Sequence, residues 1–191
     1  MSVWNTAPAR PTASGTAAPP RLRRRVDVPG VLGRWALSAV LLAYGLWIAA
    51  HRGTYTWLDH GDLMVHEAGH FFFRFLGHGM HVAGGTLMQL LLPALLAAHF
   101  LRHHYRTGAQ LMGFWLGQSF VNASVYAADA RARALPLLGG DTVFHDWHTM
   151  LSAAGLLWAD TAIGYALFGC GLAVMLGTVL LPLRMGLETE E

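Results

Sequence analysis

Two histidines four residues apart enclose one glutamate in the pentapeptide His-Glu-Ala-Gly-His at residues 66–70. On a helix, positions i and i+4 lie on one face, so both imidazoles can bind one metal ion. Glu67 then lies beside that ion, where a carboxylate can take a proton from a water molecule. It is the only glutamate before the C-terminal tail, in a chain with 13% charged and 54% hydrophobic residues. The pattern therefore predicts a metal site with a general base.

A third ligand should come from elsewhere in the chain. A catalytic zinc ion normally has three protein ligands and a water molecule, and the two histidines supply only two. Histidine and aspartate are dense in residues 129–148. We predict His145 as the third ligand, because it lies just outside a helix that Asp146 is expected to cap. The alternatives, as ligands or as hydrogen-bond partners of the ligands, are Asp146, Asp129 and Asp141.

Polar residues also form one stripe on a predicted helix over residues 107–128 and its end. Asn122, Tyr126, Asp129 and Arg133 follow the spacing i, i+4, i+7 and i+11, which places them on one face. Such a stripe can join helices by hydrogen bonds. It can equally line the site, where Asn122 or Tyr126 would bind substrate or an oxyanion. The sequence leaves both interpretations open.

Long apolar runs must position these residues. Four runs contain no charged side chain: residues 35–50, 82–101, 107–128 and 161–183. A helix that crosses a bilayer needs ~20 apolar residues, which the first run reaches if Val31 and Leu32 join it. We therefore predict an all-α fold, a polytopic membrane helical bundle with four spans and one shorter helix that carries the histidine pair.

The helix with the histidine pair is the ambiguous element. Asp59 and Asp62 are both suitable N-caps, so we expect this helix to begin near residue 60 and to end at Gly77. It is either re-entrant, which gives four spans, or it crosses, which gives five. The positive-inside rule does not separate these topologies, because arginine is distributed equally well in both. Gly84-Gly85 on the next helix should let a neighbouring helix approach closely.

The remaining segments predict how the chain is organised. Residues 1–30 are rich in Ala, Pro, Thr, Ser and Arg and should form a disordered cytoplasmic tail, with Pro29-Gly30 as the break before the first helix. Residues 31–185 would form the membrane-embedded domain, and residues 186–191 an acidic C-terminal tail. The arginines before the first apolar run fit a cytoplasmic membrane flank and not a nucleic-acid surface. We expect a multi-pass protein in lipid, in a bacterial-type inner (plasma) membrane.

His-Glu-x-Gly-His in an apolar helix resembles the motif of the site-2 protease group, the intramembrane zinc metalloproteases that cut transmembrane segments. The resemblance covers mainly residues 60–101. It implies one zinc ion per chain held by His66 and His70, with Glu67 as general base. That group takes its third ligand from a Leu-Asp-Gly tripeptide, which this chain lacks. Asp129 and Asp141 are the nearest substitutes for that aspartate.

The expected function is thus a membrane-embedded HExxH zinc metallopeptidase that cuts a peptide or membrane-protein substrate in or near the bilayer. One alternative is a di-iron, histidine-box membrane oxidase or desaturase-like enzyme. Its three boxes would be His66 with His70, His99 with His103 and His104, and His145 with His148. A second alternative is a non-catalytic membrane protein that binds metal. The sequence does not indicate the substrate or the oligomeric state.

Overall fold

The computed structural model describes residues 28–138 and 144–183, and every regular element in these ranges is helical. The long helices are α1 (Val28–Ala50), α2 (Trp57–Phe73), α3 (His78–Arg102), α4 (Arg106–Ala128) and α6 (Asp160–Val179). The short ones are the 3-10 turn η1 (Arg74–Leu76), α5 (Asp146–Ala153) and the 3-10 turn η3 (Leu157–Ala159). The prediction of an all-α fold is confirmed.

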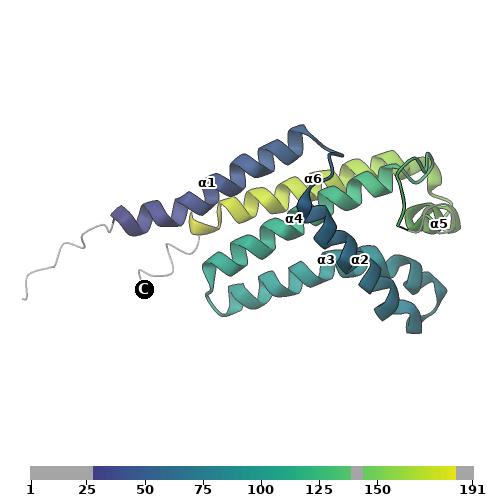
Figure 1. Ribbon diagram of the computed structural model, residues 1–191, viewed down its shortest axis with the longest axis horizontal. Helices are drawn as coiled ribbons and strands as arrows, with labels where there is room; N and C mark the ends of the chain where they lie inside the picture. The colour runs from purple at the N-terminus through teal and green to yellow at the C-terminus, as the bar shows by residue number, and fades with distance from the viewer. Residues whose placement is uncertain (1–27, 139–143, 184–191) are drawn as a thin grey trace, which may run out of the picture.

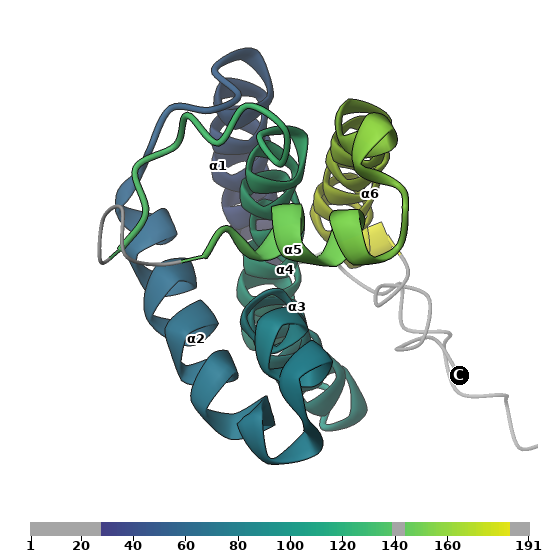
Figure 2. The ribbon, with the colours of Figure 1, turned by 90° about the vertical axis from the view of Figure 1, so that its right-hand side faces the viewer.

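Helices α1, α3, α4 and α6 run lengthwise, and α2 crosses them obliquely beside α3 (Figure 1). Helix α4 packs against α6 and α3, and α1 packs mainly against α6. Helix α5 and residues 129–138 lie over one end of the bundle, where α5 packs against α3 and α4 (Figure 2). This end brings the histidine pair and the segment after α4 together.

Two predicted helix boundaries were wrong by a few residues. Helix α1 already begins at Val28, so Pro29 does not break it; a proline is tolerated in the first helical turn, where its missing N–H has no intrahelical acceptor. Helix α2 begins at Trp57 with Thr56 as its N-cap, and the Asp59 carboxylate accepts the Thr56 backbone N–H. Asp59 thus completes a capping box from inside the helix. Of the disordered tail expected at residues 1–30, residues 28–30 belong instead to α1 and the rest lies outside the described residues, as does the expected tail at 186–191.

Helix α4 is the polar centre of the bundle. Its buried residues include Gln110, Gln118, Ser119 and Ser124. Gln110 donates to the Ser38 hydroxyl, so this amide joins α4 to α1. Burying an amide is costly unless it is hydrogen-bonded. Partners on neighbouring helices therefore allow α4 to be polar at the centre of an otherwise apolar bundle.

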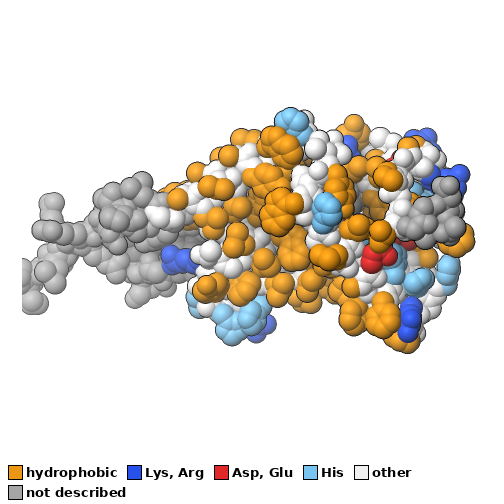
Figure 3. All heavy atoms as spheres, in the orientation of Figure 1, with side chains coloured by type: hydrophobic (Ala, Val, Ile, Leu, Met, Phe, Trp, Pro, Cys, Tyr) orange, Lys and Arg blue, Asp and Glu red, His pale blue; other side chains and the backbone are white. Residues whose placement is uncertain are grey.

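Two described helices are long and apolar enough to cross a membrane, at His78–Arg102 and Leu157–Leu183, and the apolar part of α1 is shorter. Large hydrophobic side chains such as Leu46, Trp158 and Tyr165 are exposed. Figure 3 shows this mostly hydrophobic surface, with acidic side chains visible near the end that holds α5. These features are consistent with membrane association, because exposed apolar area of this extent is unusual on a monomer in water.

The predicted close approach at Gly84-Gly85 is confirmed. A Cβ atom at Gly69 of α2 would meet the backbone carbonyl of Gly84 on α3, and one at Gly85 would meet the His66 ring. Small residues at both contact points let the helix backbones touch. The register between α2 and α3, and hence the position of His66, depends on these glycines.

Gly69→Ala should therefore destabilise the protein, whereas Gly61→Ala on the same helix should not. The methyl group at position 69 would push against α3, and overpacking of this kind costs ~1–3 kcal/mol. A Cβ at Gly61 would have no atom within 4 Å, and alanine in a helix gains ~0.5–1 kcal/mol over glycine. Thermal unfolding of the two purified variants compares these effects. Equal unfolding temperatures would contradict the close helix contact.

Candidate metal centre

Helix α2 presents His66 and His70 on one face, as their spacing predicts. His66 is buried and His70 is half-buried, and their ring centroids lie 4.8 Å apart. The His66 ring has room because it lies against Gly85 of α3. The α2–α3 contact therefore places the histidine pair in the interior and not on the exposed side of α2.

Asp146 completes a group that could hold a metal ion. Its Oδ2 atom lies 2.9 Å from Nε2 of His66 and 3.2 Å from Nε2 of His70. One ligand atom from each of these residues falls within 4.8 Å of the others. Asp146 is in the first turn of α5 and is buried. Among the residues that the structure describes, this is the only such group of three.

The outer nitrogen of each imidazole has a partner of its own. His66 Nδ1 is 3.3 Å from Oε1 of Gln89, and His70 Nδ1 is 2.7 Å from the backbone oxygen of His81. An oxygen acceptor at Nδ1 requires a proton there, so a metal ion could bind only at Nε2, where it would replace the hydrogen bond that each ring makes to Asp146. Both rings therefore have the orientation that a metal site needs, with Nε2 toward a common point.

Tyr126 holds Asp146 in place. The tyrosine hydroxyl accepts the Asp146 backbone N–H at 3.0 Å and donates toward Oδ2 at 3.4 Å. Burial tends to raise the pKa of Asp146, but hydrogen bonds from His66 and His70 outweigh it and hold this pKa at about 2. The carboxylate is thus ionised at neutral pH, which is the form that binds a cation.

His145, the predicted third ligand, lies elsewhere. It is the N-cap of α5, the position expected for Asp146, and its Nδ1 accepts the His148 backbone N–H at 3.2 Å. Its Nε2 lies 3.3 Å from Oδ2 of Asp129, so both ring nitrogens have partners away from the histidine pair. Burial lowers the His145 pKa, and Asp129 opposes that shift in part. His145 therefore positions α5, and Asp146 takes the place predicted for it.

The other candidate residues have distinct positions. Asp129 accepts the backbone N–H groups of Ala134 and Leu135, so it shapes the turn after α4. Asp141 lies outside the described residues. The Asn122 amide is bonded to Asp59 and Gln89, and the Tyr126 hydroxyl to Asp146. The polar stripe on α4 thus joins helices and also supports the site.

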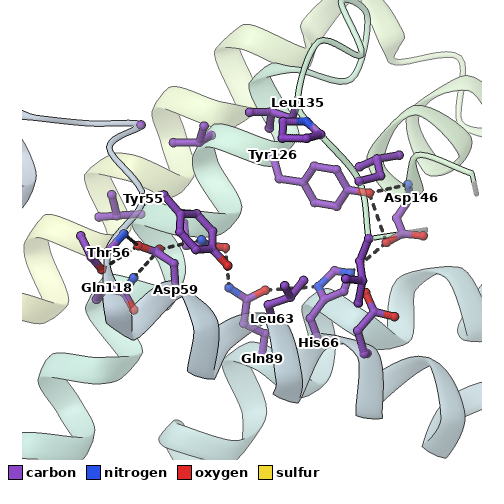
Figure 4. A pocket seen from close by; sticks show the side chains of 18 of the residues that line it. Tyr55, Thr56, Asp59, Leu63, His66, Gln89, Gln118, Tyr126, Leu135 and Asp146 are labelled. Carbon is purple, nitrogen blue, oxygen red and sulfur yellow. Dashed lines mark hydrogen bonds and ion pairs between the residues drawn. The ribbon is translucent and has the colours of Figure 1, made fainter. Parts of the chain in front are cut away.

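Glu67 is exposed and lines a cavity of about 770 Å³ together with the three candidate ligands. Apolar side chains from α1, α2, α4 and the loop after α4 form much of its wall; among them are Ile48, Leu63, Val121, Val125 and Leu137. Figure 4 shows His66 and Asp146 at one part of this cavity and Asp59 with Gln118 at another. A water molecule at the metal site would therefore have the Glu67 carboxylate in the same cavity. The apolar wall of the cavity could hold a hydrophobic substrate.

Binding of a divalent metal ion should release about one proton at neutral pH. The hydrogen bond to Asp146 raises the pKa of His70 to about 9, although burial opposes this shift. The metal-free imidazole is therefore protonated at pH 7, and a zinc ligand must be neutral. The affinity for such an ion should consequently rise by about tenfold per pH unit between pH 6.5 and 8. Calorimetry in buffers of different ionisation enthalpy measures the released proton; an affinity that does not change with pH would contradict this.

Comparisons with protein-family models, curated proteins and solved structures find no match. The site is therefore interpreted from its own geometry.

Proposed function

We propose that this chain is a membrane-embedded zinc metallopeptidase that hydrolyses peptide bonds in or near the bilayer. The proposal depends chiefly on one observation: ligand atoms of His66, His70 and Asp146 converge within 4.8 Å beside a cavity that Glu67 also lines. Two imidazole nitrogens and one carboxylate oxygen, with room for a further ligand, are a donor set that suits catalytic zinc. One zinc ion per chain is expected.

Bound zinc would lower the pKa of a water molecule to ~7 and polarise the scissile carbonyl. Glu67 would take the proton from the attacking water and pass it to the leaving amine. It can do so only because its side chain lines the cavity. Tyr126 would keep Asp146 in its ligating position. The apolar cavity wall would hold a hydrophobic peptide segment and limit the access of bulk water.

The membrane topology is part of the proposal. Helices α1, α3, α4 and α6 would be four spans, and α2 would lie between them as a re-entrant or interfacial helix that does not cross. Its oblique direction beside α3 favours this arrangement over a fifth span (Figure 1). Both termini would then be cytoplasmic. The arginines before α1 favour a bacterial-type inner membrane with the N-terminus inside.

Geometry favours this proposal over the di-iron histidine-box alternative. His81 contacts His70 at the site, whereas His99 lies eighteen residues further along α3. At 1.5 Å per residue this separation is ~27 Å, far too long for a shared metal pair. His103 and His104 follow at the same distant end. A non-catalytic metal-binding protein is the other alternative, and the exposed Glu67 beside the ligands favours hydrolysis over it.

A cleavage assay tests the proposal. The full chain in lipid vesicles, loaded with zinc, would be incubated with a library of single-span membrane peptides, and new termini would be identified by mass spectrometry. We expect cleavage that a chelator abolishes and that added zinc restores. A zinc-loaded protein that leaves the whole library intact, or cleavage that continues after chelation, would contradict the proposal.

A further inference from the structure

A chain of hydrogen bonds joins His66 to the buried carboxylate of Asp59, seven residues earlier on α2. His66 Nδ1 is 3.3 Å from Oε1 of Gln89. Gln89 Nε2 donates to Oδ1 of Asn122 at 2.8 Å, and Asn122 Nδ2 donates to Oδ1 of Asp59 at 2.7 Å. Figure 4 shows Asp59, Gln89 and His66 in this order along the cavity. Three helices thus contribute to one continuous path.

We propose that Asp59, acting through the amides of Asn122 and Gln89, keeps a proton on Nδ1 of His66, so that a metal ion must bind at Nε2. Asp59 is then a positioning residue. This inference rests on the metal site proposed above.

The sense in which the hydrogen bonds along this path are donated is set by Asp59. Its Oδ2 accepts the backbone N–H and the hydroxyl of Thr56, and its Oδ1 accepts from the amides of Gln118 and Asn122. An ionised carboxylate can only accept hydrogen bonds. Asn122 must therefore turn its NH₂ group toward Asp59.

Each amide passes this constraint to the next group. With its NH₂ group on Asp59, Asn122 presents its oxygen to Gln89, and Gln89 must turn its own NH₂ group toward that oxygen. Gln89 then presents its oxygen to His66, so the Nδ1 atom must carry the proton. Nε2, which faces Oδ2 of Asp146 at 2.9 Å in the metal-free protein, is then the atom at which a metal ion can bind. Asp59 thus fixes the proton on Nδ1 without touching the imidazole.

One further contact holds Gln89, and it is weaker. Gln89 Nε2 also lies 3.4 Å from the backbone oxygen of Ser119, near the outer limit for a hydrogen bond. The 2.8 Å contact with Asn122 should dominate the orientation of the amide. Because supporting partners of metal ligands are worth ~10–100-fold in metal affinity, loss of the path should be measurable.

Asp59→Asn tests the inference, because the new amide can donate as well as accept and the path can then reverse. In the metal-free protein, ¹⁵N NMR should show an unprotonated His66 Nδ1 that the wild type does not show. Zinc affinity should fall by about tenfold, at the lower end of the range for such partners. An unchanged tautomer together with unchanged affinity would overturn the proposal.

A charge swap provides a stricter test. In the double variant Asp59→Asn, Asn122→Asp the carboxylate moves one step along the path and still accepts from the Gln89 amide. Gln89 should again present its oxygen to His66. The protonated Nδ1 and most of the zinc affinity should return with it. If the swap folds but is no better than Asp59→Asn, the direction of the path does not control His66.

Two more variants control for folding. Asp62→Asn makes the same substitution at a buried carboxylate of α2 that bonds to Trp115 and Ser119 and not to the path; its tautomer and affinity should match the wild type. Gln89→Met removes the link at similar volume and should lose affinity even if Asp59→Asn does not fold. If the wild type itself takes up no zinc, the proposed function fails, while the NMR readout still tests the path.

Discussion

Glu67→Gln should abolish peptide hydrolysis while the protein retains its zinc. The amide has the shape of the carboxylate but cannot accept the proton from the attacking water, and general-base catalysis is worth ~10²–10⁴-fold. Because Glu67 is not one of the three converging ligands, metal content should stay at the wild-type value. Cleavage rate and zinc content of the same preparation measure both effects.

A control for this experiment is Asp62→Asn, which also replaces a carboxylate by an amide on α2 but lies outside the catalytic group. Its cleavage rate should equal that of the wild type. Glu67→Gln with full activity would exclude Glu67 as the base. Loss of zinc in Glu67→Gln would instead make Glu67 a ligand, as the non-catalytic alternative allows.

Asp146→Ala should lose zinc, and His145→Ala should keep it. Asp146 provides an oxygen within 3.2 Å of both candidate histidine ligands, so its removal should cost more than the ~10–100-fold attributed to supporting partners. His145 acts through the N-cap of α5, and loss of a cap costs ~1 kcal/mol of stability. Zinc titration and thermal unfolding of both variants separate the two roles.

The opposite result, with zinc lost in His145→Ala and kept in Asp146→Ala, would restore the ligand set predicted from sequence. Weak zinc binding in both variants with a lowered unfolding temperature in His145→Ala would show that α5 must be in place before Asp146 can bind.

The helical runs and the histidine pair could be predicted because both depend on short-range patterns. Charge-free runs gave the positions of α1, α3, α4 and α6 to within a few residues, and the i, i+4 spacing placed His66 and His70 on one face. The start of α2 was missed because Asp59 caps the helix as its third residue, with Thr56 as the N-cap. In the sequence alone, an aspartate in this position looks like an N-cap itself.

The sequence could not show whether His145 or Asp146 is the third ligand. The two residues are adjacent, and only the orientation of the backbone decides which side chain points toward the histidine pair. Which one reaches the histidine pair depends on how α5 docks, and that depends on Tyr126 and Asp129. Gln89 was missed altogether as a site residue. One signal was available: it is the only amide in the apolar run 82–101, and a lone amide there is costly without a partner.

X-ray absorption at the zinc edge, on the purified full chain, tests the central claim most directly. We predict about one zinc ion per chain with two imidazole nitrogens at ~2.0–2.1 Å, oxygen ligands at ~2.0–2.2 Å and no sulfur. The signal should disappear in the His66→Ala, His70→Ala double variant. Iron in place of zinc, or a zinc site that persists unchanged in the double variant, would contradict the account.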